Sequence, residues 1–289
     1  MRPKKPLHPD GRTSWLLVSP LVLVLAFFLV LPILTIAVVS FWNYNEFTFF
    51  PDFIFDNYLY LLTSSVTLST YLKTLKFMVL TWIFCTLIGF TVAYFLAFHV
   101  RSLGAQIGLF LLCTIPFWTS NIIRMISWIP FLGRNGIANS ALIELGVIDA
   151  PLDWLLFSDF AVVLAFVHLY VLFMVVPVFN TMMRIDKSLI EAARDAGAGG
   201  FAILTNVIIP LSKPGIMIGS IFIVTLVMGD FITVRFMSGG QSASVGRVIS
   251  NEIALLQYPA AAANAVVLLA TVLLMISVML RFVDIRKEL

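Results

Sequence analysis

The 289-residue chain is 61% hydrophobic and only 11% charged, with a formal net charge of +3 at pH 7. An average soluble domain is about 45–50% apolar and about 25% charged, so this composition excludes an ordinary soluble protein and predicts a chain that lies in lipid. Because the apolar residues come in blocks of about 20 with no sustained alternation of polar and apolar positions, the spans are expected to be helices rather than β-barrel strands.

Six apolar blocks predict an all-α membrane protein with six transmembrane helices. In chain order the blocks cover residues 15–41, 76–98, 107–129, 160–183, 216–237 and 260–283. The first block follows a basic tail, residues 1–14. A secretory signal has the same order, a basic segment and then an apolar one. The first block is longer than the apolar region of about 7–15 residues found in a cleavable signal, so we expect it to remain as the first span. Residues 284–289 form the opposite tail.

The distribution of basic residues predicts the orientation. Placing both tails in the cytoplasm puts twelve of the 18 Lys and Arg residues on that side. The other six lie in outer segments or outer helix ends: Lys73, Lys76, Arg124, Arg134, Arg235 and Arg247. Cytoplasmic loops of membrane proteins carry an excess of Lys and Arg, so the bias favours cytoplasmic termini.

The segment 184–213, between the fourth and fifth blocks, is predicted to contain a short cytoplasmic helix. Ser188 followed three residues later by Glu191 is typical of a capping box, so a helix is expected to start there. Gly197 is placed to end it in the left-handed conformation. A second apolar piece, residues 201–209, is expected to pack under the bundle and to stop near Pro210 and Pro214.

Polar residues at membrane depth are costly and are therefore candidates for the substrate path. Asp230 lies in the fifth block beside Phe231, and a carboxylate near an aromatic ring suits a cationic amine. The alternative is that Asp230 lies near the outer headgroups or pairs with Arg235 or Arg124. Both interpretations stay open on the sequence.

The third block carries a second set of path candidates. Trp118, Asn121 and Arg124 are successively three residues apart, which places them on one stripe of a continuous helix. That stripe could line the path, or it could be an interfacial aromatic belt with one snorkelling arginine. Tyr170 in the fourth block is a weaker path candidate.

The chain shows no device for nucleotide or metal chemistry. Cys85 and Cys113 fall in apolar blocks, and the three histidines have no metal-ligand spacing, so neither a disulfide nor a metal site is predicted. The phosphate-binding pattern G-x-x-x-x-G-K-[ST] does not occur in the sequence. We therefore expect no cofactor and no enzymatic activity in this chain.

The segment 184–213 resembles the EAA loop of permeases from binding-protein-dependent ATP-binding-cassette importers. Glu191, Ala192 and Ala193 are followed after three residues by Gly197, and the pattern closes on Val207, Ile209 and Pro210, where the family has I-x-L-P. The resemblance extends over residues 70–283 and is greatest to the spermidine/putrescine type. It is carried by IIRMISW at 122–128, Gly133, Gly136 and Asn139, NSALIELGVID, KSLIEAARDAGA, IIPLSKPGI, Met228 to Asp230, and the segment 246–259.

The resemblance implies the type I importer permease fold, with the core in residues 70–283 and a coupling helix that docks on a separate ATPase. By motif, Glu191, Ala192, Ala193 and Gly197 would contact the ATPase, with Ser188, Asp195 and Pro210 in the same coupling segment. It also implies an inner-membrane location and partners that comprise two ATPase subunits holding ATP and magnesium, a second permease that differs in polyamine systems, and an extracytoplasmic binding protein.

The substrate is the least determined part of this assignment. A polyamine is favoured, and opines, phosphonates or other small solutes are alternatives because recognition rests mainly on the binding protein. A secondary, ion-coupled transporter is the rival class. Such a protein is expected to show inverted repeats and interrupted helices with ion ligands, and neither is evident in the sequence.

Overall fold

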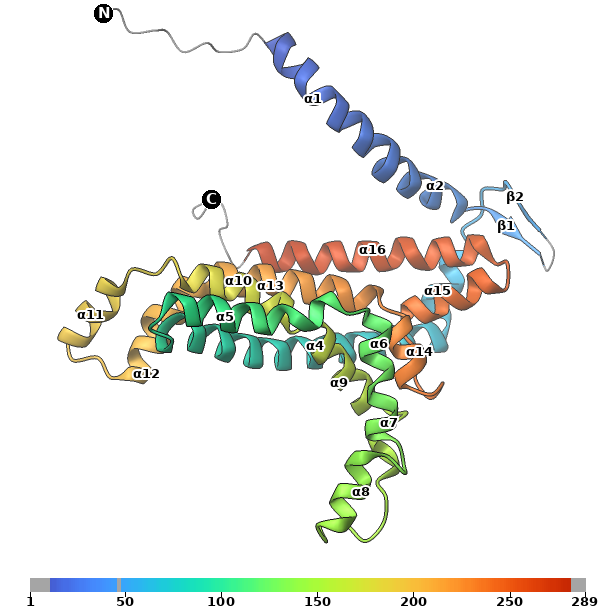
Figure 1. Ribbon diagram of the computed structural model, residues 1–289. Coiled ribbons are helices and arrows are strands. Elements are labelled where there is room, and N and C mark those ends of the chain that lie inside the picture. The colour runs from blue at the N-terminus through green and yellow to red at the C-terminus, as the bar shows by residue number, and fades with distance from the viewer. Residues whose placement is uncertain (1–10, 46–47, 282–289) are drawn as a thin grey trace, which may run out of the picture.

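A computed structural model describes residues 11–45 and 48–281; the predicted tail 284–289 and most of the tail 1–14 lie outside the described residues. Figure 1 shows an elongated helical bundle with α11 and α12 at one end and α14 and α15 at the other. The N-terminal half of the chain contains α1 (Gly11–Leu25), η1 (Ala26–Val30), α2 (Leu31–Val39), β1 (Asn43–Tyr44), β2 (Phe49–Phe50), α3 (Asp56–Thr63), α4 (Ser65–Tyr94), η2 (Phe95–His99), α5 (Leu103–Thr114), η3 (Ile115–Trp118), α6 (Asn121–Ile126), α7 (Trp128–Leu132) and α8 (Ile137–Glu144).

The second half contains η4 (Asp153–Leu155), α9 (Asp159–Tyr170), α10 (Leu172–Met182), α11 (Lys187–Asp195), α12 (Gly200–Ile203), η5 (Leu204–Ile208), α13 (Ile209–Gly229), α14 (Ile232–Met237), α15 (Val245–Ala254) and α16 (Tyr258–Arg281). The two short strands pair antiparallel, Asn43 with Phe50 and Tyr44 with Phe49. Several helices begin at a serine whose hydroxyl accepts a backbone N–H from the first turn: Ser64, Ser102, Ser158 and Ser244.

Within the described residues, four helices are long and apolar enough to cross a membrane, and two bent helix pairs can each provide a further span. The four are Leu17–Val39, Ser65–His99, Gly200–Gly229 and Tyr258–Arg281. The prediction of an all-helical membrane protein is confirmed, and each of the six predicted blocks overlaps one of these spans or bent pairs. Figure 1 shows the first span diverging from the bundle, and none of the 18 residues in its most apolar window is buried.

The third predicted span is not one straight helix, and this part of the prediction was wrong. The segment Leu103–Trp118 meets Asn121–Glu144 at 91°, because Thr119 and Ser120 take extended backbone angles. Pro116 in the preceding 3-10 turn has no N–H to continue a helix. As a result α6, α7 and α8 form an arm that projects sideways from the bundle (Figure 1).

The prediction that the helix after the cytoplasmic loop stops near Pro210 and Pro214 was also wrong. A single helix runs from Gly200 to Gly229 through both prolines, with a π-helical turn at Leu204–Ile208 just before Pro210. Pro210 stands in the first turn of α13, where a missing N–H costs little. Pro214 and Gly215 are buried, so tertiary packing holds the helix through the second proline.

The core of the bundle is formed by close contact between α4, α10 and α13. Met174 on α10 is fully buried, and a Cβ atom on either Gly89 of α4 or Gly219 of α13 would come within 2.8 Å of it. A Cβ on Gly215 would lie 2.5 Å from the Pro177 carbonyl oxygen and 2.9 Å from the Val178 Cα. Small residues at these positions let the helix backbones approach, which is how helices associate in lipid.

Gly215→Ala is therefore expected to damage the bundle. The added methyl group meets backbone atoms of α10 that cannot move independently, and overpacking of this kind typically costs about 1–3 kcal/mol. The measurement is the thermal unfolding midpoint and folded yield of the purified chain. Gly108→Ala is the matched control, because its Cβ would meet nothing within 4 Å. Equal stability of the two variants would contradict this account of the α10–α13 contact.

Candidate functional site

The coupling segment forms the predicted short helix, α11, but its start is capped differently from the prediction. The Asp186 carboxylate accepts the Ser188 backbone N–H at 2.9 Å, and the helix begins at Lys187. That hydrogen bond holds the pKa of the Asp186 carboxyl below its usual value. The predicted Ser188–Glu191 capping box is wrong, because Ser188 already lies inside the first turn and its N–H is satisfied by Asp186.

The end of α11 agrees with the prediction. Gly197 has a φ of +83°, in the left-handed region. Its N–H donates to the Arg194 carbonyl at 2.9 Å, and the Ala198 N–H donates to the Ala193 carbonyl at 3.0 Å. These two bonds are the Schellman pattern that closes a helix on glycine. Nothing lies within 4 Å of a Cβ built at this position, so the requirement for glycine comes from the backbone.

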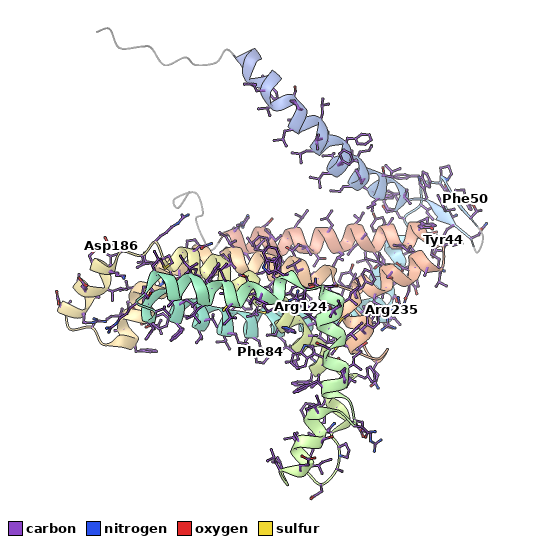
Figure 2. All side chains as sticks on the ribbon, viewed as in Figure 1. Tyr44, Phe50, Phe84, Arg124, Asp186 and Arg235 are labelled. Atoms are coloured by element: carbon purple, nitrogen blue, oxygen red, sulfur yellow. The ribbon has the colours of Figure 1, made fainter. Side chains whose placement is uncertain are left out.

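The predicted coupling residues lie on different faces of the segment. Ala193 packs on the hydrophobic core, whereas Ser188, Ala192 and Asp195 are exposed. Glu191 lines a cavity between α11 and the bundle. Pro210 is half-buried inside the long helix that follows, outside the exposed face. Asp186 lies at the α11 end of the molecule, opposite the end that carries Tyr44 and Phe50 (Figure 2).

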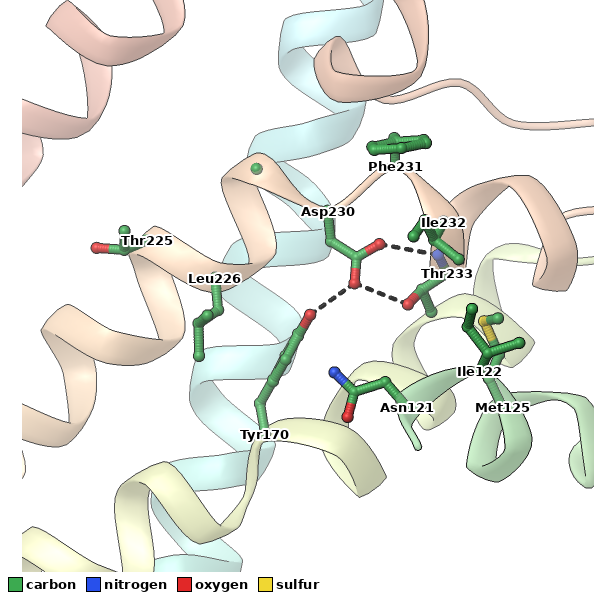
Figure 3. Close-up of a pocket in the computed structure, with 11 residues that line it drawn as sticks. Asn121, Ile122, Met125, Tyr170, Thr225, Leu226, Asp230, Phe231, Ile232 and Thr233 are labelled. Atoms are coloured by element: carbon green, nitrogen blue, oxygen red, sulfur yellow. Dashed lines mark hydrogen bonds between the residues drawn. The ribbon is translucent and has the colours of Figure 1, made fainter. Parts of the chain in front are cut away.

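The second candidate region surrounds Asp230, which lies at the break between α13 and α14. One carboxylate oxygen accepts the Thr233 N–H at 2.8 Å, and so begins α14. The other accepts the Tyr170 hydroxyl at 2.6 Å and the Thr233 hydroxyl at 2.8 Å (Figure 3). Within the described residues the ion pairs are Lys76–Asp159 and Arg134–Asp153, so the alternative that Asp230 pairs with Arg235 or Arg124 is wrong.

Asp230 and Tyr170 face a cavity of about 320 Å³ whose lining also includes Asn121, Phe231 and Thr233. Asn121 approaches from α6 across the cavity, as Figure 3 shows. The structure thus brings together four of the predicted path candidates: Asp230, Phe231, Tyr170 and Asn121. The sequence analysis missed Thr233, although the spacing of Asp230 and Thr233 is that of a helix cap and its first turn.

Trp118 and Arg124 do not share the stripe that the sequence predicts. Trp118 ends η3 before the chain turns, is 85% exposed, and lines a separate apolar cavity beside Phe173. Arg124 is buried on α6, and its guanidinium donates to the Asn121 side chain. The snorkelling alternative for Arg124 is therefore wrong. Figure 2 shows Arg124 toward the end of the bundle that carries Arg235 of α14.

A half-buried carboxyl that the sequence analysis did not single out links α15 to α16. The Asn264 amide donates to both carboxylate oxygens of Glu252, at 2.9 and 3.0 Å. Burial raises the pKa of Glu252 to about 7, with the Asn264 hydrogen bond acting in the opposite direction. No sequence pattern marked Glu252, because its environment is created by the approach of α16.

This pKa predicts a pH-dependent stability. A carboxyl whose pKa is raised on folding adds stability below its ordinary pKa of 4.5 and loses that contribution as pH rises through about 7. The unfolding midpoint of the wild type is expected to fall between pH 5.5 and pH 8 by more than that of Glu252→Gln. Glu144→Gln, at an exposed carboxyl, should keep the wild-type slope. Parallel slopes for the wild type and Glu252→Gln would contradict the prediction.

Comparison with known proteins places these two regions in context. The sequence profile of the binding-protein-dependent transport system inner membrane components matches residues 104–286. The chain is 33% identical over 259 residues to the spermidine/putrescine transport system permease protein PotB of Escherichia coli K12, covering 88% of this chain and 92% of that protein. It is 34% identical over 230 residues to PotB of Haemophilus influenzae, covering 79% of each.

Solved structures show the same fold. A bacterial transporter that imports the acidic polysaccharide alginate superposes with a TM-score of 0.74 at 18% identity, covering 96% of this chain and 98% of that one. The alginate transporter in complex with a pentasaccharide-bound periplasmic protein gives 0.71 at 16% identity, covering 95% and 96%. At these identities the likeness concerns the arrangement of the helices and leaves the substrate open.

Proposed function

The chain belongs to the binding-protein-dependent transport system inner membrane components, as the permease subunit of an ATP-binding-cassette importer, and from this premise we propose that it imports a polyamine such as spermidine or putrescine. The observation that carries the proposal is the Asp230 carboxylate. It faces a cavity, receives three hydrogen bonds, and lies beside Tyr170 and Phe231.

The electrostatics of this cavity favour a cationic guest. Asp230 accepts three hydrogen bonds, and no Lys or Arg among the described residues lies within 4 Å of its carboxylate. A carboxylate that is partly desolvated and lacks a cation gains from binding one. The neighbouring aromatic rings add cation–π attraction for an ammonium group. Relatives named for spermidine and putrescine transport support the same ligand class.

The partners follow from the two ends of the bundle. We assign the α11 end to the cytoplasm, with an ATPase subunit docked on the exposed side of α11. The whole complex would contain two ATPase subunits, which hold ATP and magnesium. The α14 and α15 end would then receive a substrate-loaded binding protein. A second permease, different in sequence, would complete the channel. The charge distribution of the sequence supports this orientation, with both termini cytoplasmic.

Crosslinking tests the orientation. The outer segments 41–72, 132–158 and 238–260 are proposed as the docking surface for the binding protein. Asn139, within α8, holds the projecting arm together, because its amide N–H donates to the Gly133 carbonyl and its amide oxygen accepts the Leu152 N–H. A photocrosslinker at exposed Glu144 or Gln241 is expected to capture the binding protein. Capture of the binding protein by a crosslinker at exposed Lys213 instead would mean that the orientation is the reverse of the one assigned.

Transport by the reconstituted complex tests the function itself. Permease, partner permease, ATPase and binding protein in sealed vesicles are expected to accumulate labelled spermidine when ATP is supplied, without an ion gradient. Opine and phosphonate ligands at equal concentration should not compete. Uptake driven by an ion gradient in the absence of ATP would support the secondary transporter instead, and preferential uptake of an opine or phosphonate would overturn the polyamine assignment.

A further inference from the structure

A cavity of about 380 Å³ lies between α11 and the adjoining end of the bundle, and four of its eleven lining residues are basic. His99 ends η2 and Arg101 lies between η2 and α5, whereas Lys187 and Arg194 come from α11. Glu191 is the one acidic residue in the lining. With histidine neutral, three cations and one anion converge on the cavity from two segments far apart in sequence.

The cations of this cavity are not neutralised by the protein. Neither ion pair of the described residues includes Arg101, Lys187 or Arg194. Lys187, Glu191 and Arg194 lie four and three residues apart on α11, so they share one face of the helix. Lys187 also opens α11, where the helix dipole disfavours a cation. The dipole favours Arg194 in the last turn, but it does not account for Lys187 or for Arg101 on another segment, and a bound anion would.

Apolar and aromatic side chains make up most of the remaining lining: Tyr94, Phe98, Ile190, Ile203 and Ile208. Further apolar residues, Phe95, Leu103 and Phe201, lie within two positions of lining residues in the sequence. All three side chains are exposed, Phe201 by 80%. Figure 1 shows α12 and the start of α5 together at this end of the bundle. A phosphate site with exposed apolar side chains around it suits an amphipathic ligand better than a free ion.

We propose that this cavity binds the phosphate of an anionic phospholipid from the membrane leaflet at the α11 end. Basic pockets between membrane helices are known to accept such headgroups. The headgroup would contact Arg101 and the Lys187–Arg194 face of α11 together, and so would tie the coupling helix to the bundle. The general excess of basic residues at this end does not account for the site, because Arg184 and Lys213 belong to that excess without lining the cavity.

Native mass spectrometry of the full chain, purified in non-ionic detergent and titrated with phosphatidylglycerol, tests the proposal. Arg101→Ala/Lys187→Ala should bind the lipid about tenfold or more weakly than the wild type, given about 1 kcal/mol for each basic residue near an anionic headgroup. Arg184→Ala/Lys213→Ala removes equal charge from the same end and should bind as the wild type does. Arg101→Lys/Lys187→Arg keeps the charge and should retain binding, which separates charge loss from misfolding.

Two further arms separate the sources of the phosphate. Phosphatidylethanolamine and inorganic phosphate, added at equal concentration, should displace little of the bound phosphatidylglycerol. Displacement by inorganic phosphate alone would mean a free-anion site and would overturn the lipid assignment. Equal loss of binding in the two alanine double variants would mean general surface attraction, and an absence of lipid binding by the wild type would leave the cavity to an acidic group of another protein. Either outcome sinks the proposal.

Discussion

Gly197→Ala permease is expected to bind its ATPase weakly and to lose most ATP-driven uptake, while it still inserts in the membrane. The φ of +83° at Gly197 costs a residue with a side chain about 1 kcal/mol or more. Because α11 has no buried residues of its own, it has little packing energy to absorb that strain. The expected consequence is a frayed end of α11 and a displaced docking face.

The chain provides a matched control two residues away. Gly199 has an ordinary φ of −71°, and, as at Gly197, nothing lies within 4 Å of a Cβ built there. Gly199→Ala should therefore leave ATPase binding intact. Gly197→Asn should fall between the wild type and Gly197→Ala, since asparagine enters the left-handed region more readily than alanine. Co-purification of the ATPase with each variant, together with uptake, is the measurement. Equal retention by Gly197→Ala and Gly199→Ala would mean that this turn does not position the ATPase.

Glu191→Lys is expected to impair ATPase attachment, and to do so through the change of charge. The sequence suggested that Glu191 closes a capping box, but Asp186 caps the helix and Glu191 lines the cavity under α11. The variant would add a fourth cation to that cavity and remove the family's acidic residue. Ser188→Ala should leave ATPase attachment unchanged, because Asp186 and not Ser188 caps the helix. If Ser188→Ala impaired ATPase attachment as much as Glu191→Lys, the cap seen at Asp186 could not be the working one.

The features predicted correctly from the sequence are those that depend on a few neighbouring residues. The end of α11 at Gly197 follows from the backbone of one residue, and the apolar blocks follow from the thickness of the membrane. The errors arose where packing decided the outcome. Pro214 stays helical because Gly215 lets α13 approach α10, and burial raises the pKa of Glu252 although the Asn264 hydrogen bond acts in the opposite direction.

In the Asp230 region the sequence indicated the polar residues but not the geometry that brings them together. The sequence singled out Asp230, Tyr170 and Asn121 by the cost of polar groups in lipid. It could not indicate that the helix breaks at Asp230, since the break is completed by a hydroxyl 60 residues away, on Tyr170. Nor did it indicate that the turn after Trp118 would carry Asn121 to the cavity and leave Trp118 outside it.

Asp230→Asn should lower polyamine uptake about tenfold or more, with ATPase attachment unchanged. An asparagine oxygen can still accept the Thr233 N–H, so the start of α14 is preserved. What is lost is the negative charge, and a hydrogen bond to a charged group contributes about 1.5–3 kcal/mol against about 1 for a neutral one. Initial uptake rates in vesicles with the complete complex, measured against spermidine concentration, are the readout. Asp153→Asn removes an exposed carboxylate of the proposed docking surface and none from the cavity, so it is the comparison that separates weaker binding-protein docking from loss of the cavity charge.

Tyr170→Phe distinguishes a cation-binding carboxylate from one that only builds the fold. The change removes the hydroxyl that donates to Asp230 at 2.6 Å but keeps the ring, and it leaves the carboxylate charged. If Asp230 binds an ammonium group, the more exposed carboxylate should still support uptake, and Tyr170→Phe should cost much less than Asp230→Asn. If Asp230 serves only to hold Tyr170 and Thr233 together, Tyr170→Phe should be the more harmful change, because Asp230→Asn keeps an oxygen that accepts the Thr233 N–H and an NH2 that can donate to the Tyr170 hydroxyl oxygen. Greater loss in Tyr170→Phe, with uptake in Asp230→Asn near the wild-type rate, would remove the intramembrane support for a cationic substrate.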